Sequence, residues 1–193
     1  MKNISILFCA FLLATTTLVG CDNSGDDNKN VPTTCYFGGW IDLQKIPTIT
    51  KETFQKQIVG KGWKHEFTQE INAKGIIAQK SYYKDLMGIS PIDFYFTEGS
   101  VTSFFYSDAL NQDVKTTKDY IYDEATNTIQ LINSKEPNNR ILECDGTHLS
   151  IIQFLGYKND GTGKLTENYG VSRYRKMTTQ ELEEMQKTYI EKP

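Results

Sequence analysis

Few residues of this chain have types and spacings that suggest catalysis. Its two histidines, His65 and His148, lie in strand-like segments with no Ser or Cys close by in sequence to serve as a nucleophile. The stretches GISPI and GVSRY lack the second glycine of a nucleophile elbow. The chain contains no P-loop, dinucleotide-binding or HExxH motif. These observations predict that the protein is not an enzyme.

The cysteines and histidines do not have the spacing of a metal site. No CxxC pair occurs, and two cysteines with two distant histidines do not make a zinc site. The sequence therefore predicts neither a metal nor another cofactor. Cys35 and Cys144 could form a disulfide in an oxidising compartment, or they could be two buried thiols. The sequence leaves both alternatives open.

The N-terminus has the composition of a processing signal. Lys2 is followed by an apolar run, residues 4–13, which is shorter than a bilayer-spanning helix. The stretch LVGC closes this region at Cys21, and an acidic, polar stretch follows to residue 30. We expect residues 1–20 to be a signal peptide, residues 21–30 a flexible tether, and residues 31–193 a single domain.

The sequence Leu18-Val19-Gly20-Cys21 resembles the bacterial lipobox. This resemblance implies that the chain is cut before Cys21 and that Cys21 carries several acyl chains, which anchor a protein stably to a membrane. The acidic stretch after Cys21 also resembles the surface-export signal of Bacteroidetes lipoproteins. The resemblance implies an outer-membrane lipoprotein that faces either the periplasm or the cell surface.

Composition narrows the classes of partner. The formal net charge is −3 at pH 7, and the lysines and arginines form no cluster, which argues against nucleic-acid binding. The chain has 11 Tyr and 10 Phe, and such aromatic content favours strands.

Local patterns predict two helices around a series of strands. Thr50 is a candidate N-cap for a helix over residues 51–59, with Gly60 at its end. Thr178 and Glu181 form a capping-box pattern that opens a C-terminal amphipathic helix. Between the helices, period-two patterns predict strands at residues 63–71, 76–84, 92–97, 101–107, 120–122, 128–132, 140–144, 148–155 and 169–176.

Tight turns between these segments force antiparallel neighbours. The clearest of these turn signals is Asp145-Gly146, between the strands over 140–144 and 148–155. A long meander has two exposed edges unless it closes on itself. We therefore predict a mainly β protein, an up-and-down β-barrel of about eight strands, with a sandwich as the alternative.

GKGW opens the first predicted strand, and YGVSRYRKM forms the last. This order of motifs resembles the calycin and lipocalin superfamily, including lipocalin-like domains of uncharacterised Bacteroidetes lipoproteins. The glycine spacing before Trp63 departs from that family's Gly-x-Trp. The resemblance implies that Arg173 or Arg175 covers the Trp63 indole by cation–π stacking and closes the barrel base.

A closed eight-strand barrel can hold one small ligand. We expect non-catalytic binding of a small apolar or amphipathic molecule; the alternative is an accessory lipoprotein that binds a protein or glycan through exposed aromatics. The same aromatics could instead be packed core, and which of two alternating sets points inward is open. The candidate lining residues are Tyr83, Phe94, Phe96, Phe104, Tyr106 and Phe154.

Overall fold

The computed structural model describes residues 46, 48–71, 91–135, 138–159 and 161–192. The expected signal peptide, the tether with Cys21, Cys35 and the predicted strand with Tyr83 lie outside the described residues. Within the described residues, no helix is both long enough and apolar enough to cross a membrane.

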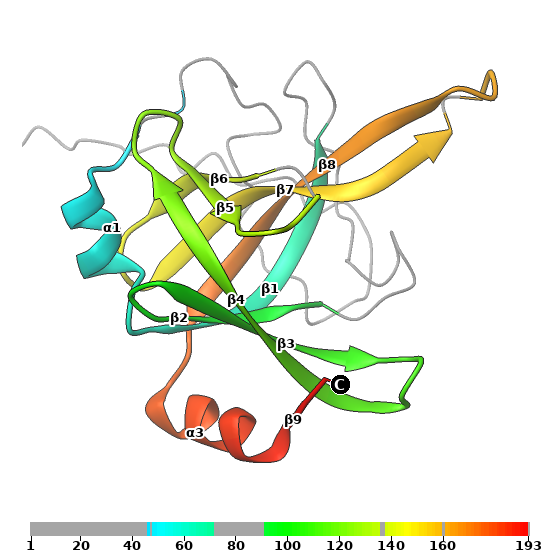
Figure 1. Cartoon of the computed structure of the whole chain (residues 1–193). Coiled ribbons are helices and arrows are strands. Elements are labelled where there is room, and N and C mark those ends of the chain that lie inside the picture. Colours follow the sequence, from blue (N-terminus) through cyan, green and yellow to red (C-terminus); the bar gives the residue numbers. More distant parts are fainter. Residues whose placement is uncertain (1–45, 47, 72–90, 136–137, 160, 193) are drawn as a thin grey trace, which may run out of the picture.

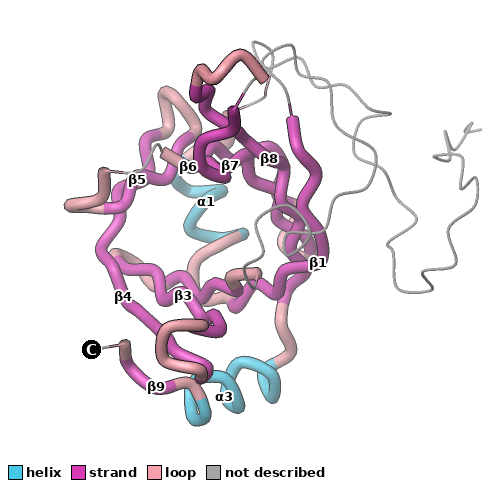
Figure 2. The backbone as a smooth tube through the Cα atoms, turned by 90° about the vertical axis from the view of Figure 1, so that its right-hand side faces the viewer, coloured by secondary structure: helices cyan, strands magenta, loops and turns pink. Residues whose placement is uncertain are grey.

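Eight antiparallel strands follow one another around a closed barrel, and the last pairs with the first (Figures 1 and 2). A short ninth strand pairs in parallel with the fourth. The prediction of a mainly β, lipocalin-like up-and-down barrel is thus confirmed. The strands form one closed sheet and not the two packed sheets of a sandwich. The strands are β1 (Gly62–Ile71), β2 (Asp93–Phe96), β3 (Ser100–Ser107), β4 (Gln112–Asp123), β5 (Thr128–Leu131), β6 (Asn139–Cys144), β7 (His148–Asn159), β8 (Leu165–Lys176) and β9 (Ile190–Glu191).

The strands β4, β7 and β8 are longer than the sequence pattern predicted. β4 begins at Gln112 rather than at Tyr120, because residues 112–119 pair along the whole of β3 even though their pattern is polar. β7 runs on to Asn159 and β8 begins at Leu165, whereas the pattern predicted strands over 148–155 and 169–176, so the two strands form a longer hairpin (Figure 1). Backbone pairing with a neighbouring strand, not apolar alternation, sets these ends.

The helix α1 (Lys51–Gln57) closes one end of the barrel. The Thr50 side chain accepts a hydrogen bond from the Thr53 amide at 3.1 Å, as expected of an N-cap. Gly60 has a φ of 74°, which lets the chain turn directly into β1. Phe54 and Ile58 are fully buried among inward-facing strand residues, and α1 lies within the outline of the ring in Figure 2.

Inward-facing side chains fill this end of the barrel. The Phe54 ring stacks on Tyr122 with centroids 4.1 Å apart, and it contacts Tyr120 at 5.8 Å. Each such fully buried side chain contributes about 1.5–3 kcal/mol to folding. The buried members of this cluster are Phe54, Ile58, Trp63, Phe96, Val101, Tyr120, Ile129, Ile141, Leu149, Ile151 and Tyr174.

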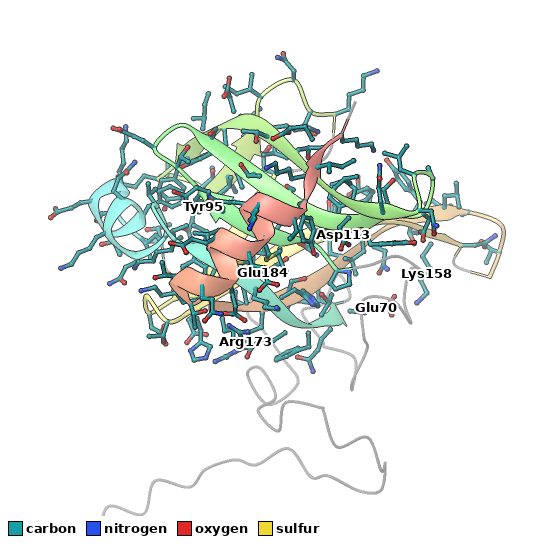
Figure 3. All side chains as sticks on the ribbon, turned by 90° about the horizontal axis from the view of Figure 1, so that it is seen from below. Glu70, Tyr95, Asp113, Lys158, Arg173 and Glu184 are labelled. Atoms are coloured by element: carbon teal, nitrogen blue, oxygen red, sulfur yellow. The ribbon has the colours of Figure 1, made fainter. Side chains whose placement is uncertain are left out.

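The helix α3 (Thr179–Thr188) packs on the outside of the barrel, close to Tyr95 in Figure 3. The capping box of Thr178 and Glu181 is formed as predicted. Met185 packs with Phe104 and Met177 in a small outer cluster. The amphipathic helix therefore covers part of the barrel wall.

Candidate functional site

Two of the predicted lining residues face inward, but they belong to the packed core. Phe96 is buried, and Phe94 packs against the same cluster, 5.4 Å from the Tyr174 ring and 6.0 Å from Phe96. They form the apolar end of the barrel interior, beside α1 and Trp63.

The other described lining candidates, Phe104, Tyr106 and Phe154, point outward and so do not line the interior. On β3, Val101 pairs with Phe96 and shares its core cluster, which turns Phe104 and Tyr106 to the other face. Phe104 packs under α3, 5.4 Å from Tyr189, and Tyr106 is 37% exposed. Phe154 contacts Tyr169, which packs on a second apolar cluster outside the barrel.

Beyond the apolar end, four polar side chains line the inner wall of β1, β7 and β8. We call them the polar row: His65, Thr68, Gln153 and Ser172. His65 Nε2 lies 2.8 Å from Thr68 Oγ1, which lies 2.7 Å from Ser172 Oγ. The Tyr174 hydroxyl donates to Gln153 Oε1 at 3.3 Å, and the Tyr174 ring meets the His65 ring edge-on at 5.5 Å. Tyr174 therefore joins the polar row to the apolar core.

Irregular pairing on β1 brings the row together. A register shift between His65 and Phe67 accommodates one extra residue, Glu66. The shift lets His65 and Thr68, three residues apart, share the inner face, where strict alternation would separate them. Asp93 accepts a hydrogen bond from the His65 backbone amide at 2.6 Å and fixes this part of the strand.

Burial keeps His65 neutral at neutral pH. Desolvation lowers the pKa of its imidazole to about 4, because little water is left to solvate the imidazolium. Thr68 and Ser172 are fully buried, and Gln153 is nearly so. The polar row therefore offers hydrogen bonds and no formal charge.

The charged groups beside the row are already paired. Glu70, two residues after Thr68, accepts hydrogen bonds from Lys158 at 3.2 Å and from Asn168 at 3.0 Å (Figure 3). Gly170 on β8 pairs with Glu70 on one side and with Gln153 on the other, and a Cβ there would come within 2.6 Å of Leu155 and 2.8 Å of Thr68. A side chain at position 170 would thus crowd the inner wall.

The expected cation–π closure of Trp63 is not formed among the described residues. Trp63 is fully buried, and its indole N–H donates to the Ile58 carbonyl at 3.3 Å. Arg173 and Arg175 flank the inward-facing Tyr174 and so take the outer face of β8. There Arg173 lies 3.3 Å from Glu66, and Arg175 donates to Glu181 at 2.9 Å. α1 takes over the covering role expected of an arginine.

The Cys144 thiol is free in the structure and half-buried, and burial raises its pKa. Because Cys35 lies outside the described residues, the Cys35–Cys144 disulfide stays a prediction. No cluster of three or more His, Cys, Asp or Glu that could hold a metal occurs within the described part of the chain.

Sequence reasoning did not find the polar row. The sequence carries one signal that could have indicated it: Thr68, Gln153 and Ser172 are polar residues within strands that otherwise form the core. No protein-family model and no curated protein matches this chain.

Proposed function

We propose that this protein is a non-catalytic binder of a small amphipathic molecule, which it holds inside the barrel. The observation that carries this proposal is the polar row, which lies on the inner wall directly beside an apolar, aromatic region. Ligand sites of this kind combine apolar walls with a few placed polar groups. The apolar part of the ligand would contact Phe94, which is only partly buried, and its polar part would meet the row.

The geometry of the row supports a binding role over a catalytic one. Thr68 lies between the Ser172 hydroxyl and the His65 imidazole, so the imidazole is not placed to take the serine proton directly. The Asp93 carboxylate accepts its hydrogen bond from the backbone amide of His65. Neither contact activates a nucleophile in the way that a Ser–His pair does.

We also propose that the protein works at the bacterial cell envelope, held in the outer membrane by acyl chains on Cys21. This part rests on the lipobox-like sequence alone. A lipid anchor and a carrier barrel fit one another, because an anchored barrel meets membrane-derived amphipathic molecules at high local concentration.

A second candidate function is the binding of a protein or glycan partner through exposed aromatics. Tyr157 and Leu165 favour it, since they are 66% and 64% exposed on the β7–β8 hairpin. Phe154 and Tyr169 extend this surface toward the barrel. The candidate needs no ligand in the barrel.

Native mass spectrometry distinguishes the two candidates. An anchor-free chain from residue 22 would be exported behind a cleavable signal, purified without detergent and measured before and after incubation with an extract of envelope lipids. A discrete adduct that disappears on denaturation supports the carrier. A clean apo mass under both conditions contradicts the carrier and favours the partner-binding role.

A further inference from the structure

The side chains of the polar row determine which kind of polar head group a ligand can carry. This inference rests on the proposed carrier function. Gln153 and His65 are the members of the row that keep some exposure, while Thr68 and Ser172 lie fully buried behind them. Gln153 and His65 are therefore the residues that a ligand would touch. Thr68 and Ser172 are positioning residues, since they hold the His65 ring through Nε2.

The side-chain amide nitrogen of Gln153 is placed to donate a hydrogen bond to a ligand. Its carbonyl oxygen accepts from the Tyr174 hydroxyl at 3.3 Å, and within the described residues its amide nitrogen has no hydrogen-bond partner. An amide N–H of this kind pairs well with a hydroxyl or carbonyl oxygen. This nitrogen is not one of the buried side-chain atoms left without a partner among the described residues, so it keeps access to solvent and can meet a ligand that supplies an acceptor.

The electrostatics of the inner wall disfavour an anion. The polar row contains no cation, and burial keeps the imidazole of His65 neutral. Glu70 places a carboxylate on the same face of β1 as Thr68, and its nearby cation, Lys158, is already bonded to it. An ionised carboxylate or phosphate would lose its hydration here without meeting an available positive charge.

We propose that the polar row binds an uncharged head group, a hydroxyl or an amide on an apolar chain, and rejects an anionic one. The Ser172–Thr68–His65 chain suits such a head group, because two hydroxyls and a neutral imidazole can shift their protons to match a donor or an acceptor. A carboxylate offers acceptors only and brings a charge as well.

Probes that share one alkyl chain test this proposal: 1-decanol and decanamide against decanoate at neutral pH, with binding to the mature protein followed by calorimetry. We expect the two neutral probes to bind at least about tenfold more tightly than decanoate. Gln153→Met should weaken their binding about threefold to tenfold, the usual effect of losing one hydrogen bond.

Two matched controls separate the row from general effects on folding. Gln130→Met changes an exposed glutamine on β5, and Ser150→Ala changes a fully buried serine on β7 that pairs with Arg173. Both should leave binding unchanged, whereas Ser172→Ala should weaken binding of the neutral probes. If Gln153→Met fails to fold by circular dichroism, Ser172→Ala still provides the test.

The outcomes separate this inference from the function on which it rests. Equal or tighter binding of decanoate would overturn the head-group preference and leave the carrier function standing. Binding of the neutral probes that neither row variant weakens would place the ligand elsewhere and overturn the inference. Failure of all three probes to bind would overturn the carrier function and, with it, the inference.

Discussion

The buried imidazole of His65 makes the stability of the barrel depend on pH. Its pKa is about 4 in the folded protein, against 6.5 for an unperturbed histidine. Between these values the unfolded chain binds more protons than the folded one, so acid favours unfolding. The stabilisation is fully present above pH 6.5 and is lost as the pH falls toward 4. The pKa difference corresponds to about 3 kcal/mol, an upper bound because water still reaches part of the ring.

The other titrating groups with shifted pKa values change the free energy of unfolding mainly at lower pH. Hydrogen bonds donated by His148 and Thr147 outweigh the effect of burial and lower the pKa of Asp145. The hydrogen bond and ion pair with Arg175 lower the pKa of Glu181. The unperturbed pKa values are 3.8 for Asp145 and 4.5 for Glu181, so the stabilisation from these carboxyls is lost mostly below about pH 4.5. Burial raises the pKa of Asp93, which has the opposite sign and does not produce acid unfolding.

Urea unfolding at several pH values measures this effect directly. We expect the free energy of unfolding to fall by up to about 1.4 kcal/mol per pH unit between pH 6.5 and 4. His65→Gln keeps a hydrogen-bonding side chain toward Thr68 but cannot titrate, so it should flatten the curve. His148→Gln, at the other histidine, should keep the slope. A His65→Gln variant with the slope of the wild type would refute the assignment of this effect to the polar row.

Four further predictions concern the core, the inner wall, the outer helix and the anchor. Phe54→Ala should lower the free energy of unfolding by about 3–5 kcal/mol in urea titrations, because it removes the ring that closes the barrel end. Gly170→Ala should cost about 1–3 kcal/mol in the same assay, since its methyl group meets Leu155 and Thr68. Glu181→Gln should cost about 1–2 kcal/mol at neutral pH through the weakened capping box and the lost ion pair with Arg175, and this cost should shrink at acidic pH. Cys21→Ser should abolish incorporation of labelled palmitate and release the protein from the membrane fraction; retention of both would contradict the lipobox interpretation.

The features that the sequence predicted well depend on neighbouring residues. The Thr50 cap and the Thr178–Glu181 capping box are set by contacts within one helical turn. The Asp145-Gly146 turn is fixed by local hydrogen bonds from Thr147 and His148 to Asp145, together with a Gly146 φ of 85°. Because tight turns of this kind recur along the chain, they predicted antiparallel neighbouring strands and a closed barrel.

The features that the sequence did not predict depend on pairing between distant strands. The inward set on β3 follows from the pairing of Val101 with Phe96, and nothing within β3 itself distinguishes Phe104 from Phe105. The polar row depends on a register shift around Glu66, which places His65 and Thr68 on one face. Period-two reasoning without that shift separates the two residues and hides the candidate site.

NMR of the histidine ring nitrogens in the mature protein, with and without 1-decanol, tests most directly whether a ligand binds at the polar row. The two histidines serve as probe and internal control, because His65 lies on the inner wall and His148 lies at the β6–β7 turn. The account predicts a neutral His65 ring whose nitrogen signals shift when the ligand binds, while those of His148 stay unchanged. Ligand binding that leaves the His65 signals in place, or a His65 ring that is charged at neutral pH, would contradict it.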